Sequence, residues 1–101
     1  AVEESAHDVL SVISKVISEE DLRPLDPSGM ARLVEESVRM ARGRRKFSSR
    51  FSDLADLARE ASWIAGEDSS PVVTREHVAR ARETLLKART EIAREIFGET
   101  M

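Results

Sequence analysis

The segment FSDLADLAREASWIAG, from Phe51 to Gly66, sets the architecture of this chain. Apolar side chains recur in it three and four residues apart, which is the period of one face of an α-helix. The residues on this face are Phe51, Leu54, Ala55, Leu57, Ala58, Ala61, Ile64 and Ala65. The pattern predicts a helix with a wide buried face. We expect Ser48 or Ser49 to cap its start and Gly66 to end it.

Two segments before this helix follow the same period. The first is expected to be helical from about Val2 to about Ser18. The second is expected to begin at Asp26, because aspartate followed by proline is typical of an N-cap and a first helical position, and to end at Gly43. The two apolar faces consist of Val9, Leu10, Ile13, Val16 and Ile17, and of Met30, Leu33, Val34, Val38 and Ala41.

A last helix is expected between Thr74, which can cap its start, and Gly98. Its distal half, from Lys87 onward, is expected to extend beyond the core. The apolar stripe of this helix consists of Val78, Ala81, Leu85, Ala88, Ile92 and Ile96.

Two short segments are expected to be extended rather than helical. Pro24 and Pro27 prevent a continuous helix through this part of the chain, and residues 71–73, PVV, include two β-branched side chains. Residues 22–25 could pair with residues 71–73 as a short two-stranded ladder. The sequence therefore predicts a mainly all-α fold, a four-helix bundle with at most this minor β element.

The composition suits one small, helix-rich domain, since 41% of the 101 residues are hydrophobic, 35% are charged and none is cysteine. The formal net charge of −3 creates no overall positive field that would attract nucleic acid or an anionic membrane. No apolar run approaches the roughly 20 residues of a membrane span, so we expect no membrane partner. The lack of cysteine fits a reducing compartment, and we expect a cytoplasmic protein. Residues 1–5 lack a signal-peptide pattern and look like a cut within a longer chain.

The sequence contains no set of residues that would make a self-contained enzyme. It has no Gly-rich phosphate loop, no HExxH motif and no nucleophile elbow. We expect no catalytic residue and no metal site, since His7 and His77 are isolated in sequence and are expected to lie on helix surfaces. The many Glu and Arg residues are expected to form solvated faces with weak ion pairs, and Trp63 is expected to be a partly buried core or interface residue.

A basic segment, GRRKFSSRF at residues 43–51, contrasts with the acidic balance of the chain. Arg44, Arg45 and Lys46 follow one another directly, and Arg50 is separated from them by one phenylalanine and two serines. The cluster is interpreted either as a solvated loop or as a nucleic-acid patch whose side chains contact phosphates. Arg50 is either an ordinary surface arginine or a residue with a specific ligand.

The order of these segments resembles the small α-helical lid subdomain of AAA+ ATPases. The similarity is closest to the lids of Lon-like ATP-dependent proteases, and PLDPSG, SSRFSDLADLAREASWIA and PVVTREHVARA carry it. The tail LLKARTEIAREIFGETM resembles the stretch that leads from such a lid towards the protease domain. The resemblance implies a lid subdomain at residues 1–86, and the end of the last helix with a linker at residues 87–101.

The same resemblance implies a role for Arg50, which matches the sensor-2 arginine that contacts the γ-phosphate of ATP held by the large subdomain. ATP and Mg would be cofactors of the full-length parent, and none is expected for this fragment. The expected partners are the large AAA+ subdomain, the neighbouring subunits of a homo-oligomeric ring, and protein substrates. The fragment would be inactive, whereas the parent would be an ATP-dependent Ser-Lys peptidase that couples ATP hydrolysis to substrate unfolding and degradation.

Three alternatives remain open on the sequence. The chain could be the lid of another AAA+ ATPase, or a helical adaptor that never meets ATP. It could also be a DNA-binding or other nucleic-acid-binding module that uses the basic loop 42–50, through Arg42, Arg44, Arg45 and Lys46. The net charge of −3 weighs against this last alternative.

Overall fold

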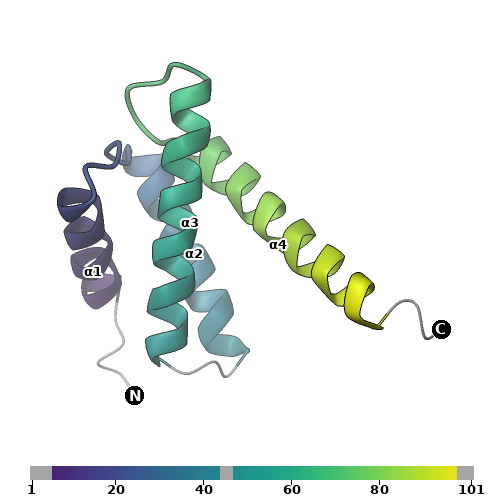
Figure 1. The fold of residues 1–101 in the computed structure, drawn as a ribbon. Helices are drawn as coiled ribbons and strands as arrows, with labels where there is room; N and C mark the ends of the chain where they lie inside the picture. The colour runs from purple at the N-terminus through teal and green to yellow at the C-terminus, as the bar shows by residue number, and fades with distance from the viewer. Residues whose placement is uncertain (1–5, 44–46, 98–101) are drawn as a thin grey trace.

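The computed structural model describes residues 6–43 and 47–97, and these residues form four α-helices (Figure 1). The helices are α1 (Ala6–Glu19), α2 (Pro27–Arg42), α3 (Phe47–Glu67) and α4 (Arg75–Phe97). No strand occurs within the described ranges, so the predicted all-α class is confirmed. The predicted start of the first helix at Val2 lies outside these ranges, and α1 ends one residue beyond the expected Ser18.

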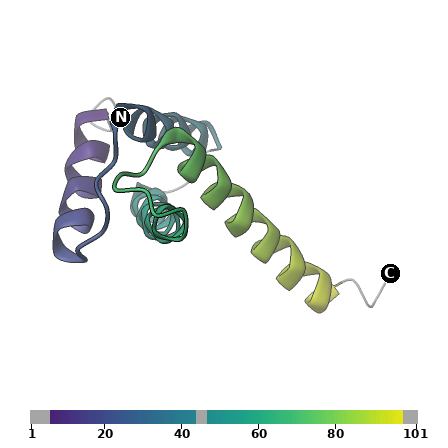
Figure 2. The ribbon, with the colours of Figure 1, turned by 90° about the horizontal axis from the view of Figure 1, so that it is seen from above.

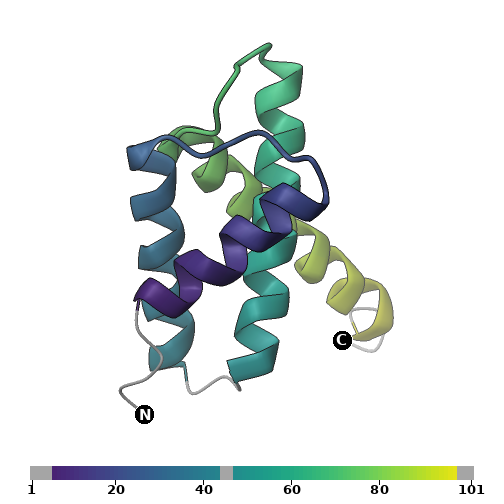
Figure 3. The ribbon, with the colours of Figure 1, turned by 90° about the vertical axis from the view of Figure 1, so that its left-hand side faces the viewer.

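The helix α3 occupies the centre of the bundle and contacts each of the other three helices. Figure 2, a view from above, shows α1 and α4 on opposite sides of α3, and Figure 3 shows α1 crossing both α2 and α3. The buried apolar cluster consists of Val9, Ile13, Leu33, Leu54, Leu57, Ala58, Ala61, Ile64, Ala65, Val73, Val78 and Ala81. Residues from α3 predominate in this cluster, which confirms the wide buried face expected from the sequence.

The start of α2 is locked to the segment before α4. Asp26 caps α2, as predicted, because its side chain accepts a hydrogen bond from the backbone N–H of Gly29 at 2.8 Å. The backbone N–H of Asp26 donates to the carbonyl oxygen of Val73 at 3.0 Å, and the N–H of Val73 donates to the carbonyl of Pro24 at 2.8 Å. The expected two-stranded ladder is therefore reduced to one parallel bridge between Leu25 and Val73.

The absence of a side chain at position 29 permits this close approach. A Cβ atom on Gly29 would lie 2.4 Å from the carbonyl oxygen of Val73, well inside van der Waals contact. The backbone oxygen cannot move without breaking its hydrogen bond to Asp26. The glycine is thus required by packing between two backbones, not by an unusual φ angle.

The prediction that Ser48 or Ser49 caps α3 is wrong. The helix begins at Phe47, so both serines lie in its first turn. Phe47 directly precedes the two serines, and none of these three residues is a proline or a glycine. The backbone can therefore be helical before either serine.

The prediction that Gly66 ends α3 is also wrong, because the helix continues to Glu67. The chain reverses at Ser69, whose φ is 58°. The N–H of Ser70 donates to the carbonyl of Ala65 at 2.8 Å and the N–H of Ser69 to that of Gly66 at 3.1 Å, which together form a Schellman motif.

The end of α1 has the same geometry as the end of α3. Asp21 has a φ of 54°, and the N–H of Leu22 donates to the carbonyl of Ile17 at 3.0 Å. By contrast Gly43, which does end α2 as predicted, has a φ of −80°. Two non-glycine residues thus adopt the left-handed conformation, while the glycine at the end of α2 does not use its conformational freedom.

The long helix α4 begins after Thr74, as predicted, and its distal half leaves the bundle (Figure 1). Every described side chain from Leu86 to Ile96 is exposed. Ile92 and Ile96 retain the apolar spacing of the buried part of the helix but are 57% and 60% exposed.

Candidate functional site

The arginine that the sequence singles out is buried. Arg50 lies in the first turn of α3 and is 5% exposed, with its Nε atom shielded from solvent. The alternative of an ordinary surface arginine is therefore wrong, because a guanidinium is rarely enclosed in this way without a structural or functional reason. The contact of Arg50 with a phosphate stays a prediction.

Most of the basic cluster lies outside the described part of the chain. Arg44, Arg45 and Lys46 fall in the gap between the described ranges, so their predicted roles stay predictions. Arg42, the last residue of α2, is described and is exposed. The side chains of Phe47 and Ser48 are likewise not among those that the structure describes.

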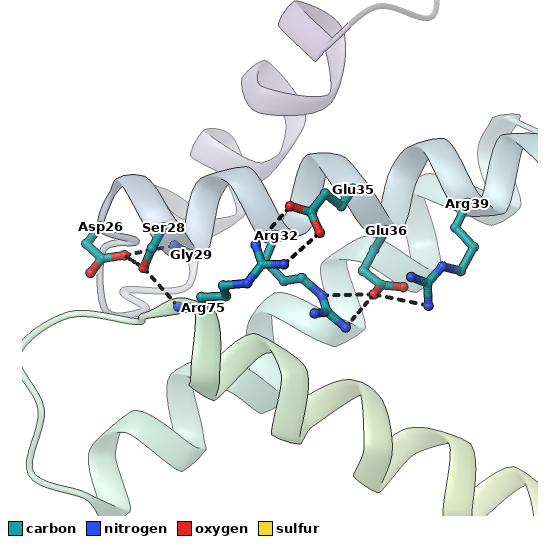
Figure 4. A network of polar contacts seen from close by, with 8 residues as sticks. All are labelled: Asp26, Ser28, Gly29, Arg32, Glu35, Glu36, Arg39 and Arg75. Atoms are coloured by element: carbon teal, nitrogen blue, oxygen red, sulfur yellow. Dashed lines mark hydrogen bonds and ion pairs between the residues drawn. The ribbon is translucent and has the colours of Figure 1, made fainter.

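A buried carboxylate on α2 joins α2 to α4, contrary to the expectation of solvated acidic faces. Glu36 is 2% exposed, and its Oε2 lies 3.1 Å from both Nε and Nη2 of Arg32, one helical turn before it. Its Oε1 lies 2.9 Å from Nε of Arg82 on α4. Arg39 approaches the carboxylate less closely, at 3.8 Å (Figure 4). These contacts compensate the buried charge, since an unpaired carboxylate at this depth would be strongly destabilising.

The helices α2 and α4 are also joined near their N-terminal ends (Figure 4). The hydroxyl of Ser28 donates to Asp26 at 2.7 Å and accepts from the backbone N–H of Arg75 at 3.1 Å. The guanidinium of Arg75 donates to both carboxylate oxygens of Glu35, at 2.8 and 3.0 Å. These hydrogen bonds lower the pKa of the Glu35 carboxyl group below its ordinary value.

The prediction of a surface position for His77 is wrong, because this side chain is only 5% exposed. Its Nδ1 accepts a hydrogen bond from the backbone N–H of Thr74 at 3.0 Å, and its Nε2 lies 3.1 Å from Oδ2 of Asp68. Since Nδ1 is an acceptor, we assign a proton to Nε2, which then donates to Asp68. His77 thus performs the back-bonding half of a capping box, which Glu or Gln usually provides at this third helical position.

Asp68 joins His77 to a second cation in the same cluster. Nη1 of Arg80 lies 2.8 Å from Oδ2 of Asp68. The hydrogen bond from Arg80, with that from His77, lowers the pKa of the Asp68 carboxyl group. No group of three or more metal-binding side chains occurs among the described residues. The side chain of His7 is not among those that the structure describes.

Trp63 is not a core residue. Its side chain, on the outer face of α3, is 61% exposed beside a shallow depression lined by Asp56, Arg59, Glu60 and Leu85. The alternative, that Trp63 is an interface residue, stays a prediction. None of the described helices is long and apolar enough to cross a membrane.

Sequence reasoning missed the burial of Glu36 and His77, although a partial signal existed for each. Arg32 and Glu36 have the spacing of a helical ion pair, and His77 stands three residues after a predicted N-cap, where a capping-box partner is found. Nothing in the local pattern identifies Arg82 as the third partner, because that contact depends on how α4 packs against α2.

A comparison with models of known protein families gives a match over most of the bundle. A family model described as "Archaeal LonB, AAA+ ATPase LID domain" matches residues 24–85, more than half of the chain. The matched region begins before α2, includes all of α3 and ends where α4 leaves the bundle. No curated protein and no solved structure matches the chain significantly.

Proposed function

Because the chain belongs to the family of archaeal LonB AAA+ ATPase lid domains, we propose that it closes over ATP held by a large AAA+ subdomain. The match over residues 24–85 is the observation that carries this proposal. The matched residues include the hydrogen bonds and ion pairs described above that join α2 to the segment before α4 and to the proximal half of α4. A lid that rotates as one body relative to a large subdomain needs such contacts between its helices, because a flexible lid would deform instead of rotating.

Arg50 is the residue of this chain that we assign to the nucleotide. Its guanidinium is permanently charged and can donate two parallel hydrogen bonds to phosphate oxygens, so its chemistry fits the γ-phosphate. The adjacent N-terminus of α3 adds the positive end of a helix dipole. ATP, held with Mg by the large subdomain, would supply the phosphate whose presence or absence changes this contact.

The burial of Arg50 adds a condition to the proposal. With 5% of the residue exposed, the guanidinium must be uncovered or must change rotamer before it can reach a ligand outside the lid. Such a rearrangement would make the contact conditional on docking of the large subdomain. A contact that differs between the ATP-bound and product states is what allows a nucleotide to shift the lid between two positions.

The wider function that we propose follows the family. The lid would work in a homo-oligomeric ring, where its rotation would couple ATP hydrolysis to the unfolding and degradation of protein substrates by a Ser-Lys peptidase domain of the parent. The chain itself contributes neither a phosphate loop nor a peptidase dyad, so both activities would reside in other parts of the parent. The nucleic-acid alternative stays a prediction, since Arg42 is the only residue of its four that the structure describes.

The test compares Arg50→Lys with Arg50→Ala in the full-length parent. Lysine keeps the charge but cannot donate two parallel hydrogen bonds to the phosphate. Both variants should therefore bind ATP and lose most ATP-dependent proteolysis. Arg80→Ala is the control, because Arg80 is exposed and lies in the separate cluster with Asp68.

Thermal unfolding of the same substitutions in the isolated chain separates a folding defect from a loss of the phosphate contact. Normal ATP turnover and proteolysis by a folded Arg50→Lys protein would contradict the assignment of Arg50. Absence of an ATP-binding region from the parent would contradict the lid function itself.

A further inference from the structure

A cavity of about 210 Å³ lies between α2, α3 and α4, outside every contact used in the proposed function except the Glu36 cluster. Its apolar lining comes from all three helices and consists of Met40, Leu57, Leu85 and Leu86. Arg39 and Arg89 stand at its rim, on α2 and α4 respectively. The cavity therefore combines an aliphatic surface with two partly exposed cations.

Within the described part of the chain, each of the two rim arginines meets one carboxylate, which leaves most of its N–H donors for other groups. Arg39 is 55% exposed at its side chain and meets Glu36 only at 3.8 Å. Arg89 is 54% exposed and uses Nη2, which lies 3.2 Å from Oδ1 of Asp53. Since a guanidinium carries five N–H donors, each rim arginine could hold a further anionic group.

The charge around the cavity is positive although the chain is acidic. The described lining residues include two carboxylates, Glu36 and Asp53, and three arginines, which are Arg39, Arg82 and Arg89. These lining groups carry a surplus of one positive charge, whereas the whole chain has a formal net charge of −3. A complementary ligand is therefore anionic.

The apolar lining identifies the kind of anion. Among the described residues, no aromatic side chain lines the cavity, so these residues offer no platform on which a nucleobase could stack. Aliphatic side chains and methionine suit an aliphatic group of another protein, because methionine adapts its shape to the group it contacts. Leu86 is 42% exposed on this side, which leaves apolar surface available to such a group.

We propose that this cavity binds an acidic segment of a partner protein. One aliphatic side chain of the segment packs against Met40, Leu85 and Leu86, and flanking carboxylates pair with Arg39 and Arg89. This site is separate from the assignment of Arg50 and holds whether or not that residue contacts a nucleotide.

The test is calorimetric titration of the 101-residue chain with the blocked peptide Asp-Glu-Leu-Leu-Glu-Asp and with a control peptide that has two serines in place of the leucines. The leucine peptide should bind with saturation at low salt, and the serine peptide should bind at least about tenfold more weakly, because it cannot use the apolar lining. Equal binding of the two peptides, or no binding of either, overturns the proposal.

Two variants locate the site. Arg39→Glu combined with Arg89→Glu should weaken binding of the leucine peptide by at least about tenfold. Leu86→Ser should weaken it without disturbing any ion pair of the described residues. Arg94→Glu is the matched control, since Arg94 is exposed on the distal part of α4 and lines no part of the cavity, and it should leave the affinity unchanged.

Circular dichroism of each variant confirms that the helices remain. A folded double variant or Leu86→Ser variant that binds as the unaltered chain does would refute this location. A single-stranded oligonucleotide is titrated in parallel. Binding of the oligonucleotide that exceeds binding of the leucine peptide, and that is lost in the double arginine variant, would assign the cavity to nucleic acid instead.

Discussion

The Nε atom of Arg82 on α4 lies 2.9 Å from Oε1 of Glu36 on α2, and the glutamate side chain is 2% exposed. This pair, with Arg32, fastens two helices through a buried charge rather than through apolar packing alone. Removal of one partner alone leaves an uncompensated charge in the interior, which lowers the free energy of unfolding.

Glu36→Ala should lower the free energy of unfolding by about 3 kcal/mol, because it leaves Arg32 and Arg82 without their buried partner. Urea denaturation of the isolated chain measures the change. Arg39→Ala is the control and should cost less than about 1 kcal/mol, since its contact with Glu36 is long and more than half of its side chain is exposed. Equal effects of the two substitutions would show that Glu36 is not held by the pair with Arg82.

Gly29→Ala should destabilise the chain by more than about 1 kcal/mol, although alanine has the higher helix propensity. The new methyl group would collide with the carbonyl oxygen of Val73, which the backbone holds in place. Gly66→Ala is the matched substitution within α3. Its Cβ would meet only the guanidinium of Arg23, at 3.3 Å or more, and that flexible group can shift. The two thermal melting temperatures should therefore move in opposite directions, and a rise for Gly29→Ala would disprove the close approach.

Ser69→Gly should stabilise the chain by about 1 kcal/mol, because a φ of 58° strains any residue that carries a Cβ atom. Gly43→Ala should cause almost no backbone strain, since the φ of Gly43 is −80° and any residue can adopt it. Chemical denaturation distinguishes the two cases. Loss of stability on Ser69→Gly would mean that the chain does not reverse at this residue.

His77→Ala should lower the free energy of unfolding by about 1–3 kcal/mol, because it removes a buried ring and leaves the backbone N–H of Thr74 without its acceptor. His77→Gln should recover part of this loss, since a glutamine at the third helical position can accept from the N-cap N–H. Equilibrium unfolding of both variants provides the measurement. If glutamine is no better than alanine, the histidine acts by packing rather than by capping.

Acid should destabilise the chain through its paired carboxylates. The pKa of Glu35 is below its ordinary value of 4.5 because of the hydrogen bonds from Arg75, and that of Asp68 is below 3.8 because of Arg80 and His77. A carboxyl group with a lowered pKa in the folded state contributes stability above its ordinary pKa and loses that contribution as the pH falls through the lower folded value. Both groups are exposed, so each contribution is small.

We therefore expect the free energy of unfolding to decline as the pH falls from about 5 to about 3, with a shallower decline for Glu35→Gln. Urea titrations at several pH values test this expectation. An identical decline in the variant would show that the pair with Arg75 contributes nothing.

Local patterns in the sequence were sufficient for the helices and several of their boundaries. Asp26 and Pro27 identify the start of α2 because a cap and the residue after it are adjacent in the chain. The apolar period identifies the buried face of α3 because the helix itself brings those residues together. The same reasoning failed at Gly66, because the position of the chain reversal is set by hydrogen bonds that a serine in a strained conformation can also support.

The site was only partly accessible to the same reasoning. The motifs quoted for the lid resemblance agree with the family that the comparison shows. The burial of Arg50 was not accessible, and the spacing around Glu36 and His77 gave only a partial signal, since each of these polar residues follows a pattern that is typical of a helix surface.

The sequence by itself therefore determined the class of fold, the order of the helices and the lid family. Only the tertiary structure decided which charges are buried, which glycine is indispensable and where a cavity opens between α2, α3 and α4. The physical reason is that helical period and capping depend on neighbours a few residues apart. The burial of Glu36 and the clearance at Gly29 depend instead on Arg82 and Val73, which the packing of α4 and of the segment before it brings against α2.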